Sequence, residues 1–164
     1  MPATPILVLL LVAALWVALG FGLARFGGWS TLATYYRGAL PDHGLHWHFI
    51  SARLGPVGYR QCLMLGADSR GLRLSMLLPL PFSHPALFIP WAEIDKLAPC
   101  RHALQPMVRL QVRRAPSIAI DLPRQLAIDV LRQAYGRTLP PGADALLAAD
   151  ARTSATAPRT LEST

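Results

Sequence analysis

Five residues of this sequence have the chemistry of a metal site. They are His43, His46, His48, Cys100 and His102. Imidazole nitrogens and thiolate sulfurs are preferred zinc ligands, and a strand would place His46 and His48 on one face. No pair of these residues recurs at a zinc-motif spacing, and the neighbouring Trp47 and Phe49 indicate packed structure. We expect no metal and no cofactor, and a metal-dependent enzyme that uses His43, His46 and His48 stays open as an alternative.

Carboxylates offer no clearer active site. Glu93 and Asp95 are two residues apart and could face one way on a strand, but no nucleophile accompanies them, so we expect a solvated strand face. The sequence also contains no G-x-S-x-G, H-E-x-x-H, Walker-type glycine loop or Rossmann fingerprint. The sequence therefore predicts a protein that is not an enzyme.

Arginine is the most abundant charged residue. The net charge is +7 over 164 residues, of which 52% are hydrophobic. The best basic cluster consists of Arg60, Arg70, Arg73, Arg109, Arg113 and Arg114. Such a cluster suits anionic lipid headgroups or an acidic protein partner, and the alternative is an ordinary solvated β face. No aromatic-basic motif of RNA-binding domains is present, so we expect no nucleic acid partner.

A stretch of twenty uncharged residues from Pro5 to Ala24 precedes these candidates. At about 1.5 Å per residue a helix of this length spans roughly 30 Å, the thickness of the hydrocarbon core of a bilayer. We therefore predict a single transmembrane anchor over residues 1–27. The alternative is a cleaved signal peptide, since Ala18-Leu19-Gly20 resembles a cleavage site, although no Lys or Arg precedes the apolar run. In that case the protein is a secreted or periplasmic binding protein.

The residues after the anchor set its orientation. Arg25 and Arg37 follow the apolar run, so the positive-inside rule predicts a single-pass inner-membrane protein with a cytoplasmic domain. We expect residues 28–40 to form a short interfacial or linker helix. Its aromatic residues Trp29, Tyr35 and Tyr36 are candidates for contact with the membrane interface, and the alternative is a helix packed on the domain.

Residues 41–137 show the alternation of apolar and polar residues that is typical of half-buried antiparallel strands. We count six strands before a helix that Pro123 could open. The hairpin within residues 71–97 organises the domain, and Gly71, Pro90 and Trp91 are its structural motif. Pro90 predicts a bulge or an edge position, because proline has no N–H to donate within a sheet.

Two segments of this hairpin carry a resemblance. GLRLSMLL followed by ALFIPWAEIDKL is similar to a Gly-Leu-x-Leu and Ile-Pro-Trp-x-x-Ile pattern of small bacterial membrane proteins, and it resembles the central hairpin of bacterial pleckstrin-homology-like (PH-like or GRAM-like) domains. The resemblance covers roughly residues 20–136 and carries structural rather than catalytic motifs. It implies a mainly-β bent sheet or partly open barrel of seven antiparallel strands, closed by a C-terminal helix, which is one strand more than we count.

The last segment, residues 138–164, is rich in Pro, Ala, Ser and Thr and has no sustained apolar period. We expect a disordered tail with one or two helical turns at ADALLAAD. The two cysteines, Cys62 and Cys100, are too few for a disulfide framework and are expected to be buried thiols. The sequence thus predicts a membrane-anchored binding or scaffolding module, without naming what it binds.

Overall fold

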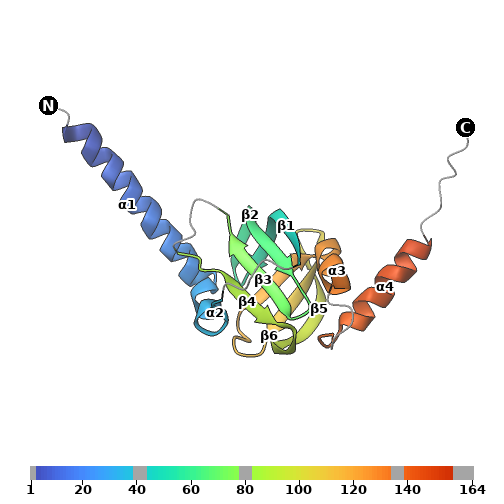
Figure 1. Cartoon of the computed structure of the whole chain (residues 1–164). Coiled ribbons are helices and arrows are strands. Elements are labelled where there is room, and N and C mark those ends of the chain that lie inside the picture. Colours follow the sequence, from blue (N-terminus) through green and yellow to red (C-terminus); the bar gives the residue numbers. More distant parts are fainter. Residues whose placement is uncertain (1–2, 39–43, 78–82, 134–138, 157–164) are drawn as a thin grey trace, which may run out of the picture.

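The computed structural model of the chain describes residues 3–38, 44–77, 83–133 and 139–156. An apolar helix leads into a curled sheet, and two further helices follow it (Figure 1). The helices are α1 (Ala3–Phe26), α2 (Trp29–Tyr36), α3 (Arg124–Gln133) and α4 (Ala143–Thr156). The strands are β1 (Leu45–Leu54), β2 (Val57–Ala67), β3 (Gly71–Met76), β4 (Leu87–Pro90), β5 (Ile94–His102), β6 (Gln105–Val112) and β7 (Ala119–Pro123), with a 3₁₀ turn, η1 (Trp91–Glu93), between β4 and β5.

The seven strands form one antiparallel sheet in the order β4-β3-β2-β1-β7-β6-β5. Its two edge strands, β4 and β5, are joined by the three residues of η1. In a flat sheet these edges would lie roughly 29 Å apart, at about 4.8 Å per strand, whereas three residues reach about 11 Å at most. The sheet must therefore curl into a half-barrel that brings its edges together.

The short turn η1 also accounts for the strand that the sequence analysis lacks. We expected the second strand of the hairpin at ALFIPW and a continuation of it, or a turn, at AEIDKL, but η1 divides this stretch into β4 and β5 at opposite edges of the sheet. The expected edge position of Pro90 is confirmed, because Pro90 ends the edge strand β4 opposite Gly71.

Gly71, Pro90 and Trp91 meet at the turn between β2 and β3. The Trp91 indole donates a hydrogen bond of 2.8 Å to the Asp68 carbonyl oxygen, and the Trp91 backbone N–H donates one of 3.1 Å to the carbonyl of Arg70. A Cβ atom at Gly71 would meet the carbonyl oxygen of Ile89. Glycine at this position therefore lets β3 and β4 approach closely where the sheet closes.

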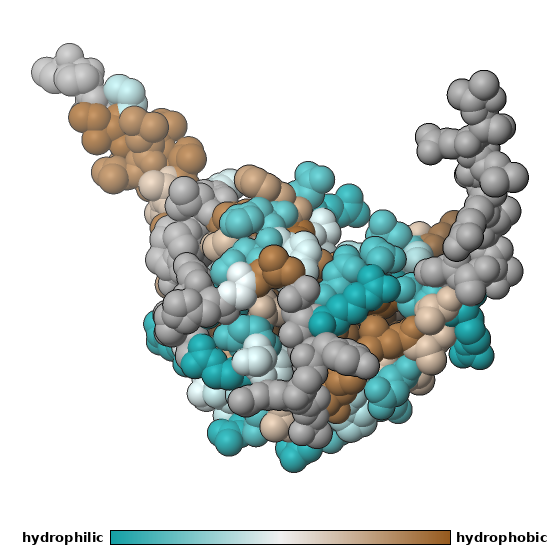
Figure 2. All heavy atoms as spheres, turned by 45° about the vertical axis from the view of Figure 1, so that its right-hand side comes forward, coloured by the Kyte–Doolittle hydropathy of each residue, from teal (hydrophilic) through white to brown (hydrophobic). Residues whose placement is uncertain are grey.

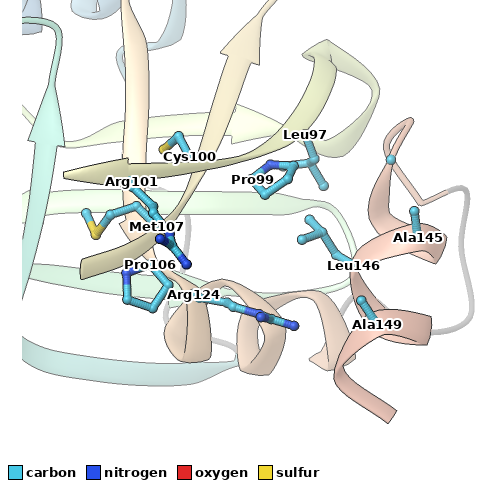
Figure 3. A pocket seen from close by; sticks show the side chains of 11 residues that line it. Leu97, Pro99, Cys100, Arg101, Pro106, Met107, Arg124, Ala145, Leu146 and Ala149 are labelled. Atoms are coloured by element: carbon cyan, nitrogen blue, oxygen red, sulfur yellow. The ribbon is translucent and has the colours of Figure 1, made fainter. Parts of the chain in front are cut away.

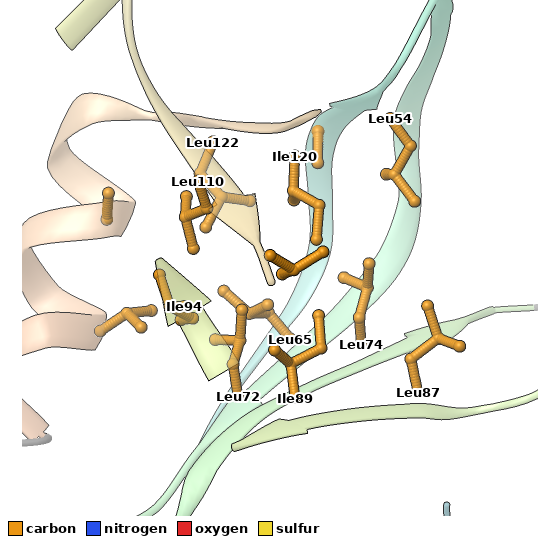
Figure 4. Packing of buried hydrophobic residues seen from close by; sticks show 14 of the residues in the cluster. Leu54, Leu65, Leu72, Leu74, Leu87, Ile89, Ile94, Leu110, Ile120 and Leu122 are labelled. Atoms are coloured by element: carbon orange, nitrogen blue, oxygen red, sulfur yellow. The ribbon is translucent and has the colours of Figure 1, made fainter. Parts of the chain in front are cut away.

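The core fills the inside of the half-barrel. Leu72, Leu74 and Ile89 from the β3–β4 side face Leu110, Ile120 and Leu122 from the β6–β7 side (Figure 4). All six side chains are buried, as the alternation of their strands predicts. Trp91, Ile94 and Val130 are also buried in this core, while Ile118 is only half-buried at its margin.

A bulge in β1 breaks one expected pattern. The pairing of β1 with β2 shifts by one residue between Trp47 and Ile50, and Phe49 in between has a positive φ of 54°. As a result Trp47 and Ile50 both pack on the core, although strict alternation places them on opposite faces. The shared strand face predicted for His46 and His48 therefore does not continue to Ile50.

The C-terminal helices close one end of the half-barrel. α3 begins at Arg124, one residue after the expected Pro123, and buries Ala127, Val130 and Leu131. α4 corrects the expected disordered tail, since residues 143–156 form a helix that buries Ala143 and Leu146. The N–H of Leu97 on the edge strand β5 donates to the carbonyl oxygen of Pro141 at 3.0 Å, so this segment also covers an open sheet edge.

At the other end of the domain, α1 leaves the sheet as a free-standing helix. Its stretch Pro5–Phe26 has a mean hydropathy of 2.8 and is long and apolar enough to cross a membrane. Figure 2 shows its hydrophobic side chains standing clear of the domain. The short helix α2 follows directly after a turn at Gly28, whose φ of 76° favours glycine.

Candidate functional site

Most of the six arginines predicted to form a basic cluster are paired with carboxylates. Four of them have carboxylate partners: Arg70 with Asp68, Arg109 with Asp121, Arg113 with Asp95 and Arg114 with Glu93. Arg60 is exposed on β2 and Arg73 is half-buried on β3. An arginine that is paired with a carboxylate attracts an anionic surface less than an unpaired one does.

The tightest of these pairs lies on the outer face of the sheet. Arg109 donates two hydrogen bonds to Asp121, from Nε to Oδ1 at 2.8 Å and from Nη2 to Oδ2 at 2.9 Å. His102 Nε2 lies 2.8 Å from the same Oδ2, and only 2% of the Asp121 side chain is exposed. Burial by itself would raise the pKa of Asp121, but the hydrogen bonds and charges of Arg109 and His102 outweigh it and lower the pKa.

Cys100 lies beside this pair, so the cluster has the residue types of a cysteine, histidine and aspartate site. However, burial and then the charge of Asp121 raise the pKa of the Cys100 thiol. A thiol with a raised pKa is a poor nucleophile, because the thiolate is the reactive form. We therefore interpret Arg109, His102 and Asp121 as a structural ion-pair cluster that joins β5, β6 and β7.

The structure corrects two of the three predicted membrane-interface residues. Trp29 is fully buried, and its indole donates a hydrogen bond of 2.9 Å to the carbonyl oxygen of Pro85. Tyr36 is also buried, with its hydroxyl 3.0 Å from Glu93 Oε2. Of the three aromatic residues, Tyr35 alone is exposed, at 50%. The alternative of a helix packed on the domain therefore describes Trp29 and Tyr36.

A buried polar network fastens α1 and α2 to the sheet. His84 Nε2 lies 3.2 Å from the Tyr59 hydroxyl, and His84 Nδ1 lies 2.9 Å from Ser83 Oγ. The Tyr59 hydroxyl also lies 3.4 Å from the carbonyl oxygen of Leu23 in α1. The Trp29 ring packs against both Tyr59 and His84, with centroids 5.6 and 5.0 Å apart. We call Trp29, Tyr59, Ser83 and His84 the junction network.

Simple sequence patterns do not predict the junction network. Its members come from α2, β2 and the segment before β4, so only the folded sheet brings them together. Burial and then the nearby Cys62 raise the pKa of Tyr59 to about 12. The hydroxyl of Tyr59 therefore stays protonated at neutral pH and acts as a hydrogen-bonding group between α1 and the domain.

Among the described residues, the histidines of the predicted metal alternative do not form a metal site. His46 packs over Gly66 on β2, whereas His102 belongs to the Asp121 cluster, and His43 lies outside the described residues. Within the described ranges, no three His, Cys, Asp or Glu side chains are grouped so that they could hold a metal ion.

A surface groove of about 580 Å³ lies between the β5–β6 hairpin and α4, on the side of the domain away from α1 (Figures 1 and 3). Leu97, Pro99 and Met107 form its sheet wall, and Leu146 faces them from α4. Arg101 and Arg124 also line the groove. Neither arginine forms an ion pair with a carboxylate in the part of the chain that the structure describes. We call this hollow the α4 groove.

No family model, curated protein or solved structure matches this chain.

Proposed function

We propose that this protein is a single-span membrane protein whose β domain is a cytoplasmic, non-enzymatic binding module. The observation that carries the proposal is the direct connection of α1 to the domain. The apolar stretch of α1 ends at Phe26, and three residues later Trp29 is buried in the core. The domain is therefore held close to the end of the apolar helix without a flexible linker.

The fold supports the resemblance to PH-like domains. Seven antiparallel strands in a curled sheet, followed by a helix against one end, are what that resemblance implies. Arg25 near the end of α1 and Arg37 just after α2 support the cytoplasmic orientation through the positive-inside rule.

The α4 groove is the binding site we propose for a protein partner. Its walls are mostly apolar, and the guanidinium groups of Arg101 and Arg124 offer hydrogen-bond donors without a carboxylate among the described residues. Arginine recognises carboxylates through two parallel hydrogen bonds. The occupant that matches this chemistry is a peptide segment with a large apolar side chain next to Asp or Glu, presented by an acidic partner.

A peptide selection tests this site. The full chain in lipid nanodiscs is used to select from displayed random peptides, and we expect enrichment of an acidic residue beside a large apolar one. Charge reversal in an Arg101→Glu/Arg124→Glu variant should weaken the selected peptides at least about tenfold, which corresponds to about 1.4 kcal/mol. Arg113→Glu is the matched control, since Arg113 is exposed and does not line the groove. Selection without this enrichment, or equal binding by the double variant, contradicts the proposed site.

A further inference from the structure

A second pocket lies at the corner between α1 and α2. It has a volume of about 470 Å³, and its lining includes Phe21, Ala24 and Arg25 from α1, Ser30 from α2, and Arg37 just after α2. The turn at Gly28 separates α1 from α2, and two arginines that are twelve positions apart in the sequence line one pocket. We call this hollow the junction pocket.

The two arginines of the junction pocket differ from those of the sheet. Arg25 and Arg37 are both exposed, and no carboxylate of the described residues pairs with either of them. The hydroxyl of Ser30 donates to the carbonyl oxygen of Ala24, and that of Thr34 donates to the carbonyl oxygen of Ser30. The guanidinium groups are therefore the charged donors that this pocket offers to an anion.

The pocket also has an apolar end. Phe21 lies one helical turn before Arg25 on α1, within the apolar stretch, and 56% of its surface is exposed. The pocket thus crosses the boundary where the apolar surface of α1 gives way to the first charged residue. A phospholipid in a bilayer presents the same order, with acyl chains in the hydrocarbon core and a phosphate at the surface.

We propose that the junction pocket binds one anionic phospholipid, with its phosphate between Arg25 and Arg37 and an acyl chain along Phe21. This inference rests on the proposed membrane span of α1. Arginine binds phosphate through paired, charge-assisted hydrogen bonds, and the negative surface of the inner leaflet concentrates such lipids at this depth. Because α2 is locked to the sheet by Trp29, a lipid held here would fix the tilt of the whole domain relative to the bilayer.

Native mass spectrometry of the full chain released from nanodiscs tests the proposal. The nanodiscs contain phosphatidylglycerol and phosphatidylcholine in equal amounts, and we expect one phosphatidylglycerol to be retained preferentially. In an Arg25→Ala/Arg37→Ala variant, the ratio of retained phosphatidylglycerol to retained phosphatidylcholine should fall by about tenfold. An Arg25→Lys/Arg37→Lys variant should keep part of this preference, because the charge remains while the paired hydrogen bonds are lost. Arg113→Ala/Arg114→Ala is the matched control and should retain the lipid as the parent does.

Two further outcomes would overturn the inference. If the parent chain retains both lipids equally, or if the Arg25→Ala/Arg37→Ala variant keeps the same preference for phosphatidylglycerol as the parent, the pocket does not select an anionic lipid. Displacement of the lipid by millimolar glycerol phosphate shows a site for a soluble phosphate instead. Failure of the chain to enter nanodiscs at all is a different result, because it contradicts the membrane span and with it the proposed function.

Discussion

Replacement of Trp29 by alanine should lower the free energy of unfolding by about 3–5 kcal/mol, the usual cost of removing a large buried aromatic side chain. Trp29 is fully buried, packs against Tyr59 and His84, and donates a hydrogen bond to the Pro85 carbonyl oxygen that the variant cannot replace. For a domain of this size the loss corresponds to a decrease of roughly 10–20 °C in Tm. Thermal unfolding of the full chain in detergent, followed by near-ultraviolet circular dichroism, measures it.

Two other tryptophans provide the comparison. Trp91→Ala should lower the free energy of unfolding by a similar amount, because Trp91 is also buried and its indole donates a hydrogen bond to the Asp68 carbonyl oxygen. Trp16→Ala on the exposed surface of α1 is the matched control and should leave the unfolding of the domain unchanged. If Trp29→Ala melts within about a degree of the parent, as Trp16→Ala is expected to do, then α2 is not part of the folded core.

The pH dependence of stability should report on Tyr59. Its pKa is about 12 in the folded chain against about 10 in an unfolded one, so above pH 10 the unfolded state loses this proton while the folded state keeps it. A raised folded-state pKa contributes stability that is complete below pH 10 and is lost as the pH rises to 12. The shift corresponds to about 2–3 kcal/mol.

A Tyr59→Phe variant separates this contribution from the rest of the alkaline transition. At pH 7 the variant should be less stable by about 1 kcal/mol, because the hydrogen bonds to His84 and Leu23 are gone. Between pH 9 and pH 12 its stability relative to the parent should improve by about 2–3 kcal/mol. Tyr35→Phe, at an exposed position, should follow the parent throughout. Parallel curves for parent and Tyr59→Phe would mean that the Tyr59 hydroxyl is not held protonated by burial.

The alternation of apolar residues predicts the sheet well wherever a strand has one buried face. Leu72 and Leu74 on β3 and Val108, Leu110 and Val112 on β6 are buried as their spacing requires. The division between β4 and β5 could not be predicted in this way. Pro90 directly before the 3₁₀ turn at Trp91 indicates an interruption of the strand, but it does not show that the chain crosses there to the opposite edge of the sheet.

Long-range contacts explain the remaining differences. The aromatic stripe of α2 has the same spacing whether it faces lipid or core, and the Pro85 carbonyl that receives the Trp29 hydrogen bond is 56 residues away. The position of Asp121 inside an apolar strand indicates a buried ion pair from the sequence alone. Its partner Arg109 is identified only by the register of β6 and β7. α4 is rich in alanine and only weakly amphipathic, so its packing depends on the edge strand β5, which the sequence analysis merged with β4.

We propose that α1 remains part of the mature protein as its membrane anchor. The intact mass of the protein purified from the membrane fraction of its own cells tests it most directly. We predict a mass that includes the whole of α1, from a protein that stays with the membranes when they are washed at high salt. A mass that lacks about the first twenty residues, with cleavage near Gly20 and the protein in the soluble fraction, would contradict the account and support a secreted or periplasmic binding protein.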